Sequence, residues 1–210
     1  MLKFLFNKKP KANETDDLVN YLIAGLGNPG REYKTSRHNA GFMVIDALAA
    51  KLQSPLTRVQ SNALVAVKTT RERRIILAKP QTFMNNSGSA VASLAKFYKV
   101  DLSNLMVIND DVDLPFGVLR MKPGGGSAGQ RGLQSIIERL GSDNFPRLRV
   151  GVGRPSGQRA SPGFVLNSFS KSETKDLEFV LSAAAEAALE FIDNGLEASM
   201  NKYNRSVLGD

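Results

Sequence analysis

Apolar and polar positions follow two kinds of pattern along this chain. Short runs rich in apolar residues predict strands over 19–25, 63–67, 74–78, 105–109, 118–122 and 148–152. Apolar residues at helical spacing predict helices over 42–52, 87–98 and 131–140. Because strands and helices alternate, and several strands are apolar throughout, we expect an α/β sandwich with a largely parallel sheet.

The clearest predicted helix lies near the end of the chain. Ser170 and Glu173 have the spacing of a capping box at its start. Gly195 is expected to end it. Between them, one helical face carries Leu177, Val180, Leu181, Ala184, Ala185, Ala188, Leu189 and Ile192.

Composition narrows the function classes. The chain has 210 residues, which fits one domain, and no cysteine, which excludes disulfides and thiolate metal sites. With 28 Lys and Arg against 20 Asp and Glu, the net charge of +8 favours a polyanionic partner, although a basic globular protein without one has the same balance. No apolar run approaches the roughly 18–20 residues of a membrane span, so we expect no membrane partner.

Residues 1–19 contain a small basic run and are predicted to be a mobile extension or the remnant of an organelle address. The rest of the composition is compatible with a cytoplasmic protein, and the extension leaves an organelle open. Residues 156–163 are expected to form a flexible lid.

His38 is the single histidine of the chain and follows a Gly-rich turn. Because the unperturbed pKa of histidine is roughly 6.5, His38 is the first candidate for a base at neutral pH. Gly25, Gly27 and Gly30 have the spacing of a dinucleotide-binding fingerprint. We reject that interpretation, because the chain continues as a loop after Gly30 and no acidic residue ends a second strand at the required distance.

Three further segments carry candidate chemistry. Asp110, Asp111 and Asp113 follow a predicted strand, where one carboxylate could orient His38 or where the cluster could be a solvated turn. A calcium loop is excluded, since the residues that follow supply too few oxygen ligands. Asn85 or Asn86 could cap a helix or stabilise a developing oxyanion.

The Gly-rich loop over 123–129 precedes a predicted helix, a place where backbone amides bind phosphate. Basic side chains surround this loop in the sequence, namely Arg120, Lys122, Arg131 and Arg149. A plain flexible loop is the alternative interpretation.

Together these segments resemble the bacterial-type peptidyl-tRNA hydrolases, and the match runs from about residue 21 to residue 204. Its pieces are Gly-Leu-Gly-Asn-Pro-Gly at 25–30, Arg-His-Asn-Ala-Gly at 37–41, and the segments 82–88, 110–115, 124–132, 147–153, 164–169 and 200–204. The resemblance implies a single-domain, three-layer αβα sandwich with a twisted, mostly parallel mixed sheet over residues 20–205. It also implies a monomer that hydrolyses the ester of peptidyl-tRNA without metal or cofactor.

The resemblance also implies roles for individual residues. His38 would be the general base, Asp110 would hold it in the basic tautomer, and Asn28 would contact the peptide. Tyr33, Phe83 and Asn85 would line the site. Arg120 and Arg149 match positions that clamp the 5′ phosphate of tRNA.

The Gly-rich loop departs from the family pattern. Ser127 and Gln130 stand where histidines are expected, and Arg131 stands where the family carries a substrate-contacting asparagine. Arginine is longer, always charged and only a donor, so it could obstruct the tRNA end or grip a phosphate. The leading hypothesis is a hydrolase in which Gln130 and Arg131 contact tRNA. The alternative is a catalytically impaired RNA-binding relative that resembles the splicing factors of this fold.

Overall fold

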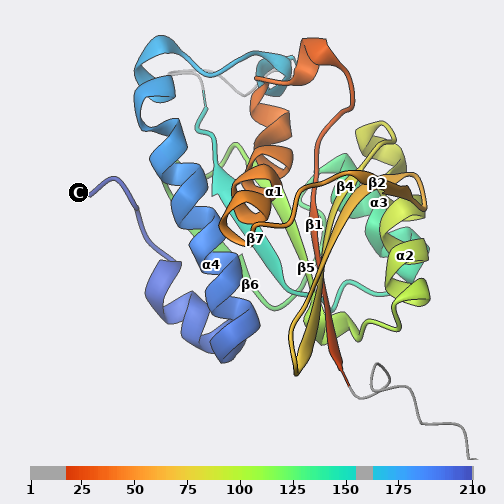
Figure 1. Ribbon diagram of the computed structural model, residues 1–210. Helices are drawn as coiled ribbons and strands as arrows, with labels where there is room; N and C mark the ends of the chain where they lie inside the picture. The colour runs from red at the N-terminus through yellow and green to blue at the C-terminus, as the bar shows by residue number, and fades with distance from the viewer. Residues whose placement is uncertain (1–17, 155–162, 210) are drawn as a thin grey trace, which may run out of the picture.

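A mixed, seven-stranded sheet in the order β2-β3-β4-β1-β5-β7-β6 forms the centre of the protein (Figure 1). The computed structural model describes residues 18–154 and 163–209. The parallel strands are β1 (Val19–Gly25), β4 (Arg73–Pro80), β5 (Leu105–Asp111) and β7 (Arg147–Gly151). The antiparallel strands are β2 (Arg58–Gln60), β3 (Ala63–Thr69) and β6 (Leu119–Lys122).

Helices cover both faces of the sheet (Figure 1). On one face, α1 (Ala40–Lys51) and α4 (Lys171–Tyr203) bury a core that includes Ile23, Leu77 and Leu148. On the other, α2 (Ser87–Phe97) and α3 (Arg131–Leu140) bury a second core. The predicted three-layer αβα sandwich with a mostly parallel sheet is confirmed. Most of the predicted extension and lid, residues 1–17 and 155–162, lies outside the described residues.

Short 3-10 helices connect these elements, and several of them border the site described below. They are η1 (Arg31–Tyr33), η2 (Arg37–Asn39), η3 (Met84–Asn86), η4 (Leu102–Asn104) and η5 (Phe164–Leu166). Within the described ranges, no helix is both long and apolar enough to cross a membrane.

The structure adds β2 to the predicted strands. Its three residues are mostly exposed and include Arg58, so they give no apolar run for sequence analysis to detect. The prediction that the last helix ends at Gly195 is right about a break in the helix and wrong about its end. The backbone there is non-helical, with φ 84° and ψ 174°, but helical structure resumes and continues to Tyr203.

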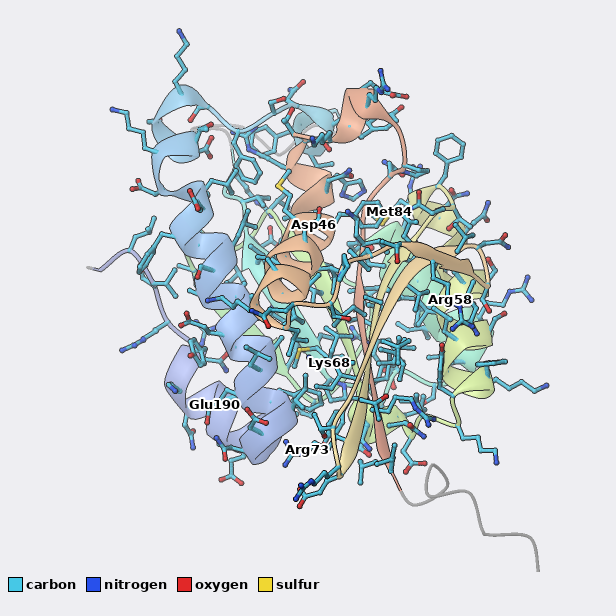
Figure 2. The ribbon with its side chains drawn as sticks, viewed as in Figure 1. Asp46, Arg58, Lys68, Arg73, Met84 and Glu190 are labelled. Atoms are coloured by element: carbon cyan, nitrogen blue, oxygen red, sulfur yellow. The ribbon has the colours of Figure 1, made fainter. Side chains whose placement is uncertain are left out.

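The residues after Gly195 fold back along α4. The Ser199 hydroxyl donates to the Ala187 carbonyl at 2.7 Å, and Lys202 pairs with Glu190 at 2.8 Å. Before the break, α4 contacts the sheet: Arg73 of β4 donates to the Ile192 carbonyl at 2.8 Å (Figure 2). The first two contacts join the residues after the break to the part of α4 before it, and the Arg73 contact joins α4 to β4.

The start of α1 lies directly against the carboxyl ends of β1 and β5. A Cβ atom added at Gly41 would lie 2.4 Å from the carbonyl oxygen of Ile108 and from the amide nitrogen of Leu26. A Cβ at Gly25 would lie 2.2 Å from the carbonyl oxygen of Gly41. Only glycine permits this approach, and it places the residue before α1 over the end of β5.

We expect Gly41→Ala to lower the free energy of unfolding by about 1–3 kcal/mol, the usual cost of overpacking. Helix propensity alone predicts the opposite sign, a gain of about 1 kcal/mol. Urea unfolding measures the difference. Gly163→Ala is the control, because no atom of the described residues lies within 4 Å of an added Cβ there. A Gly41→Ala protein as stable as wild type would contradict the close approach.

Candidate active site

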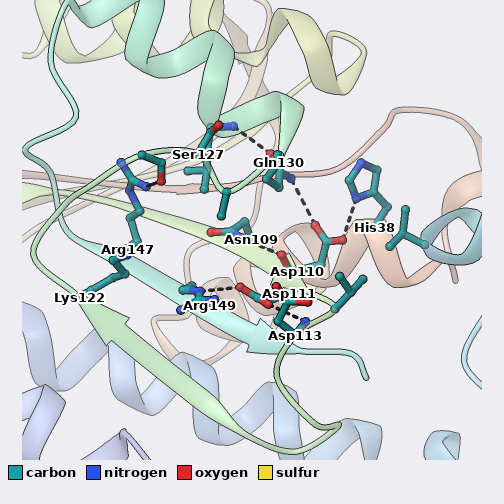
Figure 3. A pocket seen from close by; sticks show the side chains of 16 residues that line it. His38, Asn109, Asp110, Asp111, Asp113, Lys122, Ser127, Gln130, Arg147 and Arg149 are labelled. Carbon is teal, nitrogen blue, oxygen red and sulfur yellow. Dashed lines mark hydrogen bonds and ion pairs between the residues drawn. The ribbon is translucent and has the colours of Figure 1, made fainter. Parts of the chain in front are cut away.

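His38 and Asp110 meet at the carboxyl edge of the sheet (Figure 3). His38 lies in η2, just before α1, and Asp110 lies near the end of β5. The Nδ1 atom of His38 is 2.8 Å from Oδ2 of Asp110, and the two side chains are 15% and 4% exposed. When Nδ1 donates this bond, Nε2 keeps a lone pair, so the pair is arranged as a base and its orienting carboxylate.

Arg37 anchors the segment that carries His38. Its buried guanidinium donates to the Ser168 carbonyl and, at 2.6 Å, to Oε2 of Glu173. It also stacks on the rings of Phe164 and Phe169, at 4.5 and 5.3 Å from their centroids. Glu173 belongs to the predicted capping box with Ser170, which the structure confirms. The histidine is thereby fastened to the start of α4.

Asn28 is held through both its side chain and its backbone. Its side-chain Oδ1 accepts from the backbone N–H of Met84 at 2.8 Å. The backbone N–H of Asn28 donates to Oδ1 of the Asn39 side chain, also at 2.8 Å. The Asn39 side chain returns a bond from Nδ2 to the Asn28 carbonyl at 3.0 Å. Because Oδ1 of Asn28 is already engaged, its Nδ2 donor is the end of the amide left for a ligand.

Two pockets adjoin the His38–Asp110 pair, and His38 and Gln130 line both of them. The larger, of about 660 Å³, we call the aromatic pocket; besides those two residues its walls include Asn28, Tyr33, Phe83, Asn85, Arg131, Val165 and Leu166. The smaller, of about 230 Å³, we call the basic pocket; its walls include Asp110, Asp111, Lys122, Arg147, Arg149 and the Gly-rich loop.

Among known families, residues 22–209 match the model of the peptidyl-tRNA hydrolases. The chain belongs to the peptidyl-tRNA hydrolase family.

Individual relatives agree with this assignment. A peptidyl-tRNA hydrolase of Thermoanaerobacter sp. is 47% identical over 88% of this chain and 99% of its own length. A peptidyl-tRNA hydrolase of Frankia casuarinae is 46% identical over 88% of this chain and 93% of its own length. The crystal structure of peptidyl-tRNA hydrolase from Acinetobacter baumannii superposes with a TM-score of 0.81 at 32% identity, covering 89% of this chain and 96% of that one.

The three aspartates of the acidic cluster do not form a solvated patch. Asp110 pairs with His38, Asp111 pairs with Arg149 at 2.5 Å, and Asp113 pairs with Arg154. Only Asp113 is exposed. Within the described residues, no group of three or more potential metal ligands gathers.

The basic pocket is built from one face of the β6–β7 pair. In this pair Arg120 lies opposite Arg149, and Lys122 lies opposite Arg147. The pocket walls include the last three of these residues, whereas Arg120 is exposed and lies outside the described walls of both pockets. Of the two basic residues on β6 that sequence analysis named, Lys122 lines the basic pocket, and the predicted contact of Arg120 with a tRNA phosphate stays a prediction. Arg120 and Lys122 share one face of β6, so the sequence pattern does not distinguish them, and the tertiary structure decides which of them lines the pocket.

Arg147 fixes the Gly-rich loop. It is 1% exposed and donates to the carbonyl oxygens of Gly126 at 2.7 Å and Asp143 at 3.2 Å. Its guanidinium also stacks on Phe145, 4.7 Å from the ring centroid. Burial lowers the pKa of Arg147 from its ordinary value, while nearby Asp143 opposes that shift. Sequence analysis did not single out this residue, because one arginine in a strand gives no sign of burial.

The two asparagines after β4 play different parts from the predicted cap. Asn86 occupies the N-cap position of α2, but its side chain makes no capping bond. The hydroxyl of Ser87 instead donates to the Met84 carbonyl at 2.9 Å. Asn85 is exposed and lines the aromatic pocket, where its amide is free to meet a ligand.

We expect Glu173→Gln to lower the free energy of unfolding by about 1.5 kcal/mol, the lower end for a hydrogen bond to a charged group. The neutral amide keeps the shape but loses the charge that Arg37 contacts. Urea unfolding measures the effect. Glu186→Gln is the control, because its pair with Lys51 is exposed and a surface change of this kind costs less than about 0.5 kcal/mol. Equal losses in both variants would refute an anchoring role for Arg37.

Proposed function

We propose that this protein hydrolyses the ester that joins a peptide to the 3′ end of tRNA. One observation carries the proposal: the His38–Asp110 pair lies where an aromatic pocket and a basic pocket meet. Membership of the peptidyl-tRNA hydrolase family supports the same reaction.

The mechanism needs only groups that the site contains. Nε2 of His38 takes a proton from water as the water oxygen attacks the ester carbonyl. We propose that the new oxyanion accepts hydrogen bonds from Nδ2 of Asn28 and from the amide of Asn85, which both line the aromatic pocket. The tetrahedral intermediate then expels the ribose oxygen, which takes the proton back from His38. Free peptide and free tRNA leave, and His38 returns to its neutral form. General-base assistance of this kind contributes typically about 10²–10⁴-fold.

The aromatic pocket suits the terminal nucleotide and the first residues of the peptide. Tyr33 and the 61% exposed ring of Phe83 offer faces on which a base can stack. Arg131 is the single permanent charge among the described lining residues and is exposed. We propose that it meets a backbone phosphate.

The basic pocket suits a phosphate of the acceptor stem. Lys122 and Arg149 line it, and the buried Nε atom of Arg147 has no hydrogen-bond partner within the described residues. We propose that Lys122 and Arg149 bind the phosphate, with Arg120 at the exposed rim on the same strand face. The alternative, an RNA-binding relative without catalysis, is disfavoured because the base and its orienting carboxylate are in hydrogen-bond contact.

We expect His38→Ala to lower the release of N-acetyl amino acid from N-acetylaminoacyl-tRNA by at least about 10²-fold. Affinity for tRNA should stay within about twofold, because the pocket walls that contact RNA are retained. The wild-type rate should rise with pH along one ascending limb, since His38 is the single histidine. A full rate in His38→Ala would refute the mechanism.

We expect Lys122→Ala to weaken tRNA binding and to reduce the slope of log affinity against log salt by about 1, the change for one lost phosphate contact. Fluorescence titration between low and moderate salt measures it. Lys51→Ala is the control, because Lys51 lies on α1, outside both pockets, and pairs with Glu186. Identical slopes for the two variants would count against the basic pocket as the phosphate site.

A further inference from the structure

Gln130 stands between the catalytic pair and the start of α3. It is the N-cap residue of α3 and lines both pockets (Figure 3). Its Oε1 accepts from the Leu133 amide at 2.9 Å. Its Nε2 lies 3.3 Å from Oδ1 of Asp110 and 3.3 Å from Sδ of Met84. Both polar atoms of the Gln130 carboxamide therefore have hydrogen-bond partners.

The helix decides which way round this amide lies. A backbone N–H can only donate, so the Gln130 atom that faces Leu133 must be the oxygen. The nitrogen, with its two hydrogens, then faces Asp110 and Met84. A flipped amide would leave the Leu133 N–H against another donor. The orientation at the active site is thus set by the N-terminus of α3.

This orientation constrains Asp110. Because Nε2 of Gln130 can only donate, Oδ1 of Asp110 must accept, which favours the ionised carboxylate. The other oxygen, Oδ2, then accepts from Nδ1 of His38 at 2.8 Å. Two hydrogen bonds converge on one carboxylate, and Nε2 of His38 is left as the ring atom with a lone pair.

We propose that Gln130 is a positioning residue that holds His38 in its basic tautomer through Asp110. The chain of bonds begins at the Leu133 N–H, passes through the Gln130 carboxamide, and ends at the carboxylate shared with His38. A histidine at this position could donate or accept and would itself titrate near neutral pH. Glutamine does not titrate, and the Leu133 N–H fixes which end of its amide faces Asp110, so Nε2 donates to Asp110 at every pH at which the protein is folded.

The rate effects of this proposal rest on the proposed function, but its central claim can be tested without turnover. Because His38 is the single histidine, the ring ¹⁵N resonances of the untagged chain report its tautomer and its titration midpoint directly. Other titratable or charged groups share its two pockets and stay constant across the variants: Tyr33, Asp110, Asp111, Asp113, Lys122, Arg131, Arg147 and Arg149.

The decisive variant is Gln130→Glu. A glutamate keeps the oxygen that caps Leu133, so α3 and the fold should be retained. It removes the donor to Asp110 and places a second negative charge beside it. The titration midpoint of the His38 ring should rise by about one pH unit, since an added opposite charge at this range favours the imidazolium. The ascending limb of kcat/KM should move by the same amount, with KM within about twofold of wild type.

Gln130→Met removes the donor to Asp110 without adding a charge, and it also removes the oxygen that caps Leu133, so the stability of this variant is measured alongside its rate. Methionine has a similar shape but cannot orient Asp110, so we expect mixed ring tautomers and a loss in kcat of about tenfold, with KM nearly unchanged. Gln134→Glu is the matched control. It makes the same chemical change one turn further along α3, on an exposed residue that does not contact Asp110.

The expected result is a wild-type ring with its proton on Nδ1, and a shifted midpoint in Gln130→Glu but not in Gln134→Glu. Unchanged tautomer and midpoint in both Gln130 variants would overturn the proposal, as would an equal shift in Gln134→Glu. A wild-type protein with the expected tautomer and no ester cleavage would refute the proposed function instead, and would leave the positioning role standing.

Discussion

The contact between Gly41 and the ends of β1 and β5 governs the position of everything at the active site. A backbone-to-backbone approach this close leaves no room for a side chain, so α1 can begin at only one place on the sheet edge. Because His38 lies two residues before α1, its ring is brought to Asp110 of β5, which is 72 residues further along the chain. A catalytic hydrogen bond between two distant segments thus depends on packing without side chains.

Buried charges complete this framework. Arg37 is 7% exposed and Arg147 is 1% exposed, and each binds backbone carbonyl oxygens as well as an aromatic ring. A buried charge that lacks such partners destabilises a protein, so both arginines hold their partners in defined positions. Arg37 fastens the histidine segment to α4, and Arg147 fastens the Gly-rich loop to β7. The segment that carries His38 is thus held by Arg37, and the Gly-rich loop is held by Arg147.

The two pockets beside His38 differ in the charged residues that line them. Three basic residues and three aspartates line the basic pocket, whereas Arg131 is the single permanent charge among the described residues of the aromatic pocket, whose walls otherwise carry amides, aromatic rings and apolar groups. Amides can stabilise an oxyanion without exchanging protons with a base. Gln130 is likewise a neutral donor, where a second titratable ring would otherwise stand.

Local patterns in the sequence predicted most of the architecture. The apolar runs, the capping box of Ser170 and Glu173 and the break at Gly195 all report burial or dihedral preferences of neighbouring residues, which a linear sequence records. The single histidine and the family motifs identified the reaction. Tertiary structure alone decided that Lys122, not Arg120, borders the basic pocket, that Arg37 and Arg147 are buried, and that Gln130 contacts Asp110. These depend on contacts between distant segments, and a pattern of neighbouring residues does not contain that information.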